Sequence, residues 1–519
     1  MKKAFIILLS FILLVSYDLY SQNNPKVGLE QITPELLKRH IDFLASDELK
    51  GRNTPSPGLD SAAVYIANEF INLGIEKVNS SYFQNIPMCS KDLDIANTYL
   101  KFSENMKEAN FKLKKDFNPF DITGNQSVSA PVVFVGYGIT APEFGYDDYE
   151  DLDVDGKIVL VMKHEPREKD TSSIFYGDKD TYHSTLENKI ANAKKHGAVG
   201  MLLVTDPLNH LLINPQGYPW PSLFFKSMSG SKLPIKVCAT EYEMSIPVVQ
   251  VGEEVINYLF GSIDKLRNIQ KEIDSTMVPN SFQINKICDL QTKIITKRYT
   301  AKNVVGIIKG KDTKLKNEII VIGGHYDHVG YKEKSKQGED SIFNGADDNA
   351  SGTAGVMAIA KAFKKMKQPD RSVLFILFAG EEKGLYGSKY YVENPLYPIE
   401  KTIAMLNLDM ISRNSDSLQL IGEKENPDLA EIARQEAANY PLKIVNSDDH
   451  YLGGSDHYNF YKNGVSSLFF FTGIHNDYHR VSDNPDSVDH LKASNVSKLA
   501  FHLAWIIANS NKYYKINKN

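Results

Sequence analysis

Alternating strands and helices in the C-terminal part of the chain constrain its fold most. From Asn303 onward, short apolar runs alternate with segments of helical periodicity, and residues 371–378 are apolar almost throughout, as expected for a strand buried on both faces. The predicted strands are 318–324, 371–378, 402–408 and 465–471, and the predicted helices are 353–366, 428–438 and 496–507. This pattern predicts an α/β fold with a mostly parallel or mixed sheet and helices on both faces.

The preceding part of the chain has a different pattern. Residues 32–75 predict two helices around a polar break at 50–58. A β-rich block follows, with predicted strands at 131–139, 156–162, 198–204 and 246–251 and a predicted helix at 188–196. We expect no clustered histidines or carboxylates near the strand ends of this block, and we interpret it as a non-catalytic insertion over residues 116–284. Residues 22–115 and 285–519 would then form one discontinuous domain.

The first residues predict export. Lys2 and Lys3 precede an apolar run over residues 4–15, which matches a secretory signal, and we place its cleavage near Ser21. A short membrane anchor is the less favoured alternative, because the run is shorter than the roughly 20 residues that span a bilayer. We therefore expect residues 1–21 to be a signal peptide and the mature protein to be periplasmic or extracellular, without an integral membrane span.

Charge and cysteine content argue against several classes of protein. The 519 residues include 59 Lys and Arg against 64 Asp and Glu, and the net charge of −5 disfavours nucleic acid or an anionic membrane as the main partner. Cys89, Cys238 and Cys288 allow at most one disulfide, and their wide spacing argues against a cysteine-based zinc site. The sequence leaves open whether any of them pair, and it also leaves open the oligomeric state.

Polar side chains follow the predicted strands of the C-terminal part. They are two histidines and four carboxylates, namely His325, Asp348, Glu381, Glu382, Asp409 and His479. Ligands of open α/β sheets bind beyond the C-terminal ends of the strands, so we expect these side chains to meet at one edge. Carboxylates gathered there would repel one another unless a cation lay between them. The pattern therefore predicts a metal site.

The residue types indicate which metal it is. Imidazoles combined with carboxylates favour zinc over magnesium or calcium, which prefer shells made of oxygen alone. The number of ligands favours two Zn²⁺ ions with open positions for water over one closed tetrahedral site. Asp327, two residues after His325, is well placed to accept a hydrogen bond from the ring N–H of that ligand.

Five short motifs, in this order along the chain, resemble the co-catalytic di-zinc exopeptidases, a group that includes secreted aminopeptidases, aminopeptidase Y and glutamate carboxypeptidase. They are His325-x-Asp327, the turn at 345–352, the segment 378–384, the segment 407–410 and Tyr478-His479. Residues 44–52 resemble the N-terminal region of this family. The β-rich block resembles the protease-associated domain that many members carry as an insertion. The resemblance implies the zinc exopeptidase fold.

The resemblance also implies how the metal ligands divide between the two ions. His325 and Asp409 would bind one zinc ion. Glu382 and His479 would bind the other, and Asp348 would bridge both. The family places a cis peptide bond directly after the bridging aspartate, here between Asp348 and Asn349.

Further roles that the resemblance implies concern the reaction and the substrate. Glu381 would be the general base towards a hydroxide that bridges the two ions, and Tyr478 would donate a hydrogen bond to the developing oxyanion. Three neighbouring residues would either line the substrate pocket or shape its loop, namely Ser455, Asp456 and His457. Three other histidines lie near the motifs but are not expected to bind metal, namely His328, His450 and His475.

Together these expectations describe a secreted zinc aminopeptidase that hydrolyses N-terminal residues from peptides. The alternatives are a carboxypeptidase of the same fold, a single-zinc glutaminyl cyclase-like acyltransferase and a catalytically inactive receptor-like module. His325 and Asp409 argue against the single-zinc alternative, because they would supply the ligands of a second ion. The protease-associated domain would shape access or contact partners. The preferred side chain of the substrate is left open.

Overall fold

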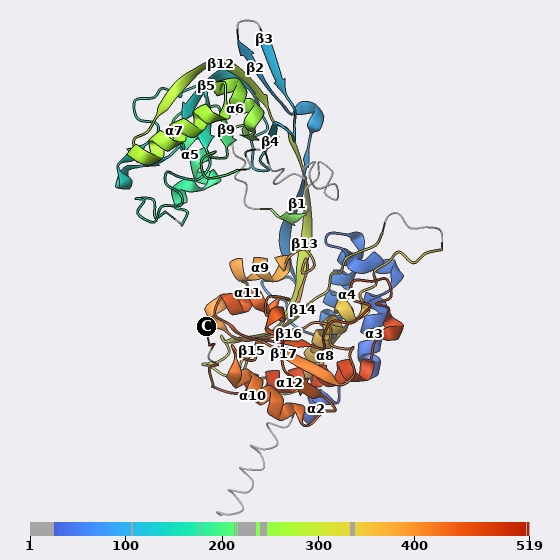
Figure 1. The fold of residues 1–519 in the computed structure, drawn as a ribbon. Coiled ribbons are helices and arrows are strands. Elements are labelled where there is room, and N and C mark those ends of the chain that lie inside the picture. Colours follow the sequence, from blue (N-terminus) through green and yellow to red (C-terminus); the bar gives the residue numbers. More distant parts are fainter. Residues whose placement is uncertain are drawn as a thin grey trace, which may run out of the picture. The chain divides into compact units, whose positions relative to one another are not determined.

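The structure is a computed structural model (Figure 1), which describes residues 25–104, 107–177, 179–211, 213, 215, 235–238, 246–332, 338–514 and 516–517. The predicted signal peptide, residues 1–21, lies outside these residues. The chain forms two compact units, of which the first is Met1–Met88 with Tyr299–Asn519 and the second is Cys89–Arg298. Among the helices of the described part of the chain, none is long and apolar enough to cross a membrane.

A nine-stranded mixed sheet forms the centre of the first unit, and eight of its strands follow one another in the order β1-β13-β15-β14-β16-β19-β17-β18. Its strands are β1 (Phe83–Leu93), β13 (Ile294–Ile308), β14 (Ile319–His325), β15 (Ser372–Phe378), β16 (Thr402–Leu408), β17 (Ser417–Ile421), β18 (Lys443–Val445) and β19 (Ser466–Phe471). The neighbouring strands β15, β14, β16 and β19 are parallel and buried along their whole length. They coincide with the four predicted strands, so the predicted α/β class is confirmed.

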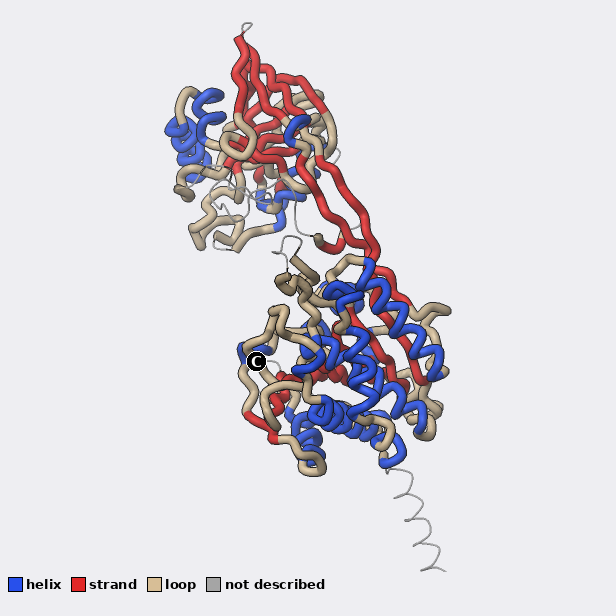
Figure 2. Tube along the Cα trace, turned by 90° about the vertical axis from the view of Figure 1, so that its right-hand side faces the viewer, coloured by secondary structure: helices blue, strands red, loops and turns tan. Residues whose placement is uncertain are grey.

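Helices cover both faces of this sheet (Figure 2). They are α2 (Lys26–Leu29), α3 (Pro34–Leu44), α4 (Pro57–Leu73), α8 (Gly352–Lys365), α9 (Tyr386–Glu393), α10 (Pro427–Ala437), α11 (His457–Lys462) and α12 (His490–Ala508). The ring of Phe375 in β15 lies 6.3 Å from that of Phe70 in α4 and 6.1 Å from that of Phe363 in α8. Phe378, three residues later, points to the opposite face, where its ring lies 6.1 Å from that of Phe460 in α11. Packing on both faces explains why β15 is apolar except for Ser372.

Short helical turns join these elements. They are η1 (Asp47–Arg52), η2 (Ile95–Asn97), η3 (Pro142–Phe144), η4 (Tyr182–Ser184), η6 (Ala346–Ser351), η7 (Ile399–Lys401), η8 (Asp449–Tyr451) and η9 (Pro485–Ser487). Two of them matter for the site. The turn η1 lies between α3 and α4, where the sequence predicts a polar break, and η6 begins the glycine-rich segment that leads into α8.

The second unit has its own sheet, with the strand order β3-β2-β12-β5-β8-β9-β11-β4. Its strands are β2 (Tyr99–Glu104), β3 (Lys107–Phe111), β4 (Phe117–Pro119), β5 (Ser127–Val135), β8 (Ile158–Met162), β9 (Gly200–Val204), β11 (Val248–Val251) and β12 (Ser281–Gln291). The remaining elements are the short strands β6 (Thr140–Ala141), β7 (Tyr146–Asp147) and β10 (Lys236–Val237) and the helices α5 (Leu186–Lys195), α6 (Glu253–Phe260) and α7 (Ile263–Thr276). Helices α6 and α7 contribute to one apolar cluster of this unit and α5 to another. The cysteines Cys89, Cys238 and Cys288 are all free.

The second unit differs from the predicted insertion in two respects. It extends beyond residues 116–284 at both ends, because β12 pairs with β2 on one side and with β5 on the other, which draws the flanking strands into one sheet. The expectation that its strand ends lack clustered histidines and carboxylates is wrong. A group of four such residues, which we call the second-unit cluster, follows β8 and β9 and consists of His164, Glu168, Asp206 and His210.

Candidate metal centre

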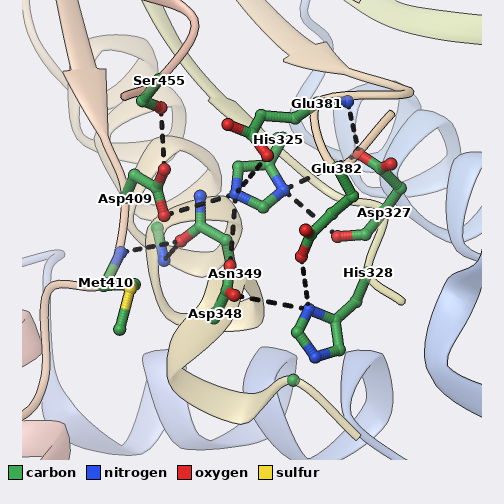
Figure 3. Close-up of polar contacts among 12 residues, drawn as sticks. His325, Asp327, His328, Asp348, Asn349, Glu381, Glu382, Asp409, Met410 and Ser455 are labelled. Carbon is green, nitrogen blue, oxygen red and sulfur yellow. Dashed lines mark hydrogen bonds and ion pairs between the residues drawn. The ribbon is translucent and has the colours of Figure 1, made fainter. Parts of the chain in front are cut away.

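The predicted ligands of the first unit lie together at one edge of its sheet. Figure 3 shows four of them, namely His325, Asp348, Glu382 and Asp409. His325 is the last residue of β14, and Asp409 directly follows β16. Glu381 and Glu382 come shortly after β15, whose last residue, Phe378, pairs with His325. Because β14, β15 and β16 are adjacent and parallel, their C-terminal ends deliver these side chains to the same place.

One group of possible ligands consists of His325, Asp348 and Asp409. The Nε2 atom of His325 lies 3.4 Å from Asp348 Oδ1 and 3.3 Å from Asp409 Oδ1. All three side chains are buried. The three ligand atoms lie within 4.8 Å of one another, a separation that one metal ion can span.

A second group consists of His328, Asp348, Glu382 and His479. The Nε2 atom of His479 lies 3.1 Å from Asp348 Oδ2 and 3.1 Å from Glu382 Oε2. On the other side, His328 Nδ1 lies 2.8 Å from Glu382 Oε1 and 3.5 Å from Asp348 Oδ2. This group is therefore also compact enough for one ion. We call the residues of both groups the first-unit cluster.

Asp348 belongs to both groups, and its two oxygens divide between them. Oδ1 faces His325, whereas Oδ2 faces His479 and His328. A carboxylate in this position can bind one cation with each oxygen. The two groups therefore form a pair of adjacent cation positions with a common ligand.

The backbone around Asp348 is fixed by hydrogen bonds. The peptide bond between Asp348 and Asn349 is cis, as the resemblance implies. The side chain of Asn349 donates to the carbonyl oxygen of Leu408 and accepts from the N–H groups of Gly352 and Met410. Gly345, at φ +60°, has no room for a side chain, because a Cβ atom there would lie 2.3 Å from the Asp348 oxygen.

Asp327 contacts both His325 and Glu381, but its backbone oxygen, rather than the carboxylate that the sequence suggests, lies at hydrogen-bond distance from His325. Its backbone oxygen lies 3.2 Å from His325 Nδ1, and its Oδ1 lies 3.7 Å from the same atom, so Nε2 is left to face the other ligands. Its carboxylate also accepts from the N–H of Glu381 at 3.2 Å and from the hydroxyl of Thr54 at 2.9 Å. Asp327 thus fixes a histidine ligand and the backbone of the carboxylate next to it.

Glu381 lies beside the cluster but belongs to neither group. Its Oε2 is 3.9 Å from His325 Nε2. Burial raises the pKa of Glu381 well above its ordinary value, and the neighbouring carboxylates of Asp409 and Glu382 raise it further, whereas His325 acts in the opposite direction. One carboxylate at this edge is therefore left free for proton transfer.

The charges of the cluster suit cations. Burial opposes charge on His479, but the carboxylates of Asp348 and Glu382 outweigh burial and raise its pKa to about 10. Burial also opposes charge on His325, and Asp409 and Glu381 nevertheless raise its pKa well above the ordinary value. Both histidines thus hold protons in an excess of negative charge, which a divalent cation would replace.

The donor atoms themselves fit zinc. In the first-unit cluster, the ligand atoms Asp348 Oδ2, Asp409 Oδ1 and His479 Nε2 lie within ion-pair distance of neighbours yet make no hydrogen bond. Most buried polar atoms in proteins make a hydrogen bond. Buried ligand atoms that make none are therefore consistent with a metal ion as their partner. Imidazole nitrogens and carboxylate oxygens are ordinary zinc ligands.

Two regions of the chain match family models. Residues 303–504 match the model of peptidase family M28, and residues 128–258 match the PA domain. The first match spans the whole first-unit cluster, and the second spans the second-unit cluster. The chain therefore resembles peptidase family M28 over residues 303–504 and the PA domain over residues 128–258, as the sequence predicts.

Individual relatives of the chain are distant. A probable zinc metalloprotease of Pyricularia oryzae is 25% identical over 256 residues, which are 40% of this chain and 50% of that protein. Aminopeptidase YwaD of Bacillus subtilis is 24% identical over 345 residues, 65% of this chain and 58% of that protein. The chain spans about half the length of the curated relatives it matches. Among solved structures, the aminopeptidase from Aneurinibacillus sp. strain AM-1 is 20% identical, covers 96% of this chain and 99% of its own, and has a TM-score of 0.46.

Ser455, Asp456 and His457 are fully buried in the first unit. The hydroxyl of Ser455 donates to Asp409 Oδ2 at 2.7 Å and accepts from the amide of Asn407 at 2.8 Å, so it orients a metal ligand. His457 packs its ring 4.9 Å from that of Phe469, and burial lowers its pKa to about 3. Burial likewise raises the pKa of Asp456 to about 7. This segment therefore supports the site from inside the fold.

Tyr478 lies next to the last ligand. Its ring stacks on that of His479 at a centroid distance of 3.9 Å, and 36% of the residue is exposed. Burial of its hydroxyl raises the pKa of Tyr478, and the carboxylates of Asp348 and Glu382 raise it further. The phenol therefore stays protonated and can donate a hydrogen bond.

The histidines that the sequence analysis sets aside have three different environments. His328 joins the second group through Glu382, which makes it the candidate ligand that the sequence analysis did not include. Its signal in the sequence is its place directly after Asp327. His475 is buried with Nε2 3.3 Å from Asp347 Oδ2, behind the cluster. His450 is exposed and belongs to neither group.

Arg52 is a second residue that the sequence analysis did not single out. It is fully buried, and its guanidinium donates to the backbone oxygens of Tyr326, Asn344 and Gly345, among others. Burial lowers the pKa of Arg52 to about 10, and Asp348 is the carboxylate that most opposes this shift. Arg52 therefore holds together the segments that carry His325 and Asp348 and adds a positive charge beneath them.

Proposed function

We propose that the chain is an exported zinc-dependent aminopeptidase that removes N-terminal residues from peptides. The observation that carries this proposal is the position of Asp348, whose two oxygens face two separate groups of ligands. Such an arrangement is suited to two cations that act on one substrate. Glu381, a carboxylate outside both groups, supplies the proton transfer that hydrolysis requires.

Two zinc ions fit the residues present. His325 and Asp409 would hold one ion, Glu382 and His479 would hold the other, and Asp348 would bind both. His328 lies within reach of the second ion as an additional ligand or as a partner of Glu382. When bound, the ions would polarise the scissile carbonyl group and lower the pKa of water.

Glu381 is the proposed general base. Its backbone N–H donates to Asp327, which holds the side chain beside His325. From there the carboxylate takes a proton from the attacking water and passes it to the nitrogen of the leaving amine. General acid–base catalysis of this kind contributes about 10²–10⁴-fold to the rate.

Tyr478 is the proposed donor to the substrate oxygen that becomes negative. Its ring is held by stacking on His479, and its hydroxyl stays protonated at neutral pH because its pKa is raised. A protonated hydroxyl beside the developing oxyanion stabilises the transition state.

Action at the N-terminus is supported by relatives. Aminopeptidase YwaD matches 65% of this chain, and a probable leucine aminopeptidase of Trichophyton verrucosum is 31% identical over 202 residues. Export is supported by the predicted signal peptide, residues 1–21.

The test is a substrate panel with the purified mature chain. We expect zinc-loaded protein to hydrolyse leucine p-nitroanilide but not its N-acetylated form, a chelator to stop the reaction, and added zinc to restore it. Cleavage restricted to N-blocked peptides with a free carboxylate would instead indicate a carboxypeptidase. Cyclisation of an N-terminal glutamine, or no turnover of any substrate, would contradict peptide hydrolysis altogether.

A further inference from the structure

The second-unit cluster lies on two loops that leave adjacent strands. β8 and β9 are parallel and in register up to the pair Met162 and Val204. The loop after β8 carries His164 and Glu168, and the loop after β9 carries Asp206 and His210. Each loop therefore supplies one histidine and one carboxylate, four residues apart, at the C-terminal end of the same part of the sheet.

Each histidine of this cluster contacts both carboxylates. The Nδ1 atom of His164 lies 2.6 Å from Asp206 Oδ1 and 3.7 Å from Glu168 Oε2. The Nε2 atom of His210 lies 2.8 Å from Glu168 Oε2 and 3.6 Å from Asp206 Oδ2. The two imidazole rings stack at a centroid distance of 4.4 Å. One ligand atom from each residue therefore lies within 4.8 Å of all the others.

These distances suit a tetrahedral zinc ion. Ligand bonds of about 2.0–2.1 Å in a tetrahedron place neighbouring ligand atoms roughly 3.3 Å apart. The four measured separations, between 2.6 and 3.7 Å, lie on both sides of that value. Two imidazoles with two carboxylates favour zinc over magnesium or calcium.

Neighbouring side chains hold the cluster in place. Asp206 is fully buried, and its Oδ2 accepts from the amide of Gln270 in α7 at 3.5 Å. The Oε1 of Gln270 in turn accepts from the N–H of Leu208, in the same loop as Asp206. Outer partners of this kind orient metal ligands. A cleft of about 840 Å³, lined by His164 and His210 among others, gives an ion access from solvent.

Ordinary ion pairs explain the arrangement less well. His183 and Glu143, in the same unit, form such a pair, with His183 Nε2 2.7 Å from Glu143 Oε1. In the second-unit cluster, by contrast, both carboxylates are shared by both histidines. The buried cation Lys189 interacts with Asp206, but its amine donates to the backbone oxygen of Tyr137.

We propose that His164, Glu168, Asp206 and His210 form a zinc site in the PA domain, separate from the first-unit cluster. Four protein ligands complete a tetrahedral shell, so the ion has no open position for water and acts as a structural link. It joins the loops that follow β8 and β9. This site stands independently of the proposed peptidase activity.

The test counts zinc in the full chain. Wild type and the variant His164→Ala/His210→Ala are loaded with zinc, freed of excess metal by gel filtration and measured by mass spectrometry. We expect the variant to hold one equivalent fewer than wild type, with aminopeptidase activity unchanged. The control His183→Ala, which removes a histidine from an ion pair of the same unit, should hold as much zinc as wild type. Equal zinc content in all three proteins would overturn the proposal.

Two further variants keep this test decisive. Glu168→Gln preserves the size of the side chain and removes the charge of one ligand. It should also hold one equivalent of zinc fewer than wild type, so it replaces the double variant in the test if that variant does not fold. His325→Ala/His479→Ala removes two histidines of the first-unit cluster, and it should still retain one equivalent. Loss of all zinc from this last variant would show that the second-unit cluster binds none. Failure of peptide hydrolysis with one equivalent retained would affect only the proposed function.

Discussion

Each unit of the molecule gathers histidines and carboxylates at the C-terminal ends of adjacent parallel strands. The two clusters differ in whether a carboxylate remains outside the groups of possible metal ligands. In the first-unit cluster, Asp348 is common to two groups, and Glu381 remains outside both. In the second-unit cluster, one ligand atom from each of the four side chains lies within 4.8 Å of the others, around a single centre. The comparison teaches that a strand edge can hold a metal in either unit, whereas hydrolysis also requires a free carboxylate to move a proton.

The largest expected effect concerns that free carboxylate. Glu381→Gln should lower kcat by about 10²–10⁴-fold, because it removes the proposed general base, and zinc content should stay the same. Activity on leucine p-nitroanilide and zinc content are measured on the same sample. Glu400→Gln, at an exposed carboxylate of η7, is the matched control and should have no effect. Loss of zinc from Glu381→Gln would make Glu381 a ligand and remove the difference between the clusters.

The buried cation beneath the first-unit cluster offers a second test. Arg52→Met should lower the free energy of unfolding of the first unit by about 3–5 kcal/mol, because the backbone oxygens of Tyr326, Asn344 and Gly345 lose their donor and nearby carboxylates lose a counter-charge. Urea unfolding measures the change, with Lys401→Met at an exposed site as control. A change below about 1 kcal/mol would mean that the carbonyl groups find other donors.

A smaller effect is expected from the support of a single ligand. Ser455→Ala removes the hydroxyl that donates to Asp409, and zinc affinity of the first-unit cluster should fall by about 10–100-fold. Competition with a coloured chelator measures this affinity. The exposed Ser415→Ala should leave it unchanged. Unchanged affinity in Ser455→Ala would show that Asp409 is held by its backbone alone.

The smallest effect is a pH dependence of zinc binding. In the metal-free chain Asp348 and Glu382 overcome burial and raise the pKa of His479 to about 10, so this residue carries a proton at neutral pH. Zinc needs the neutral ring, and binding therefore releases that proton. Affinity of the first-unit cluster should rise by about tenfold per pH unit between about pH 7 and 9 for each proton released. Calorimetry in buffers of different ionisation enthalpy measures the release, and a constant affinity would show that His479 is already neutral.

The parts of the molecule that could be predicted from the sequence share one property. The strands β14, β15 and β16 are buried along their whole length and end at or shortly before His325, Glu381 and Asp409, so that their order brings these three residues to one edge. The α/β class follows from that local pattern, whereas the division of the ligands came from the family resemblance and did not include His328. Asp327 could be predicted in the same way, because it lies two residues from the ligand it supports.

The features that were missed depend on contacts between distant segments. Arg52 precedes the second unit in the sequence and Asn344 follows it, yet the guanidinium of Arg52 donates to the backbone oxygen of Asn344. Nothing near Arg52 in the sequence indicates that contact. The second-unit cluster was missed because each of its loops holds only one histidine and one carboxylate, which is a weak signal until β8 and β9 are known to be neighbours. The borders of the second unit were also missed, because they depend on the pairing of β2 with β12, two strands that are far apart in the sequence.

The hydrogen bond from Thr54 to Asp327 has a consequence for how the protein is synthesised. Thr54 leaves the ribosome before the whole of the second unit, and Asp327 leaves after it. The nascent chain therefore cannot form the first-unit cluster while the PA domain is being synthesised. The N-terminal helices lack their contacts with the later strands until those strands have left the ribosome.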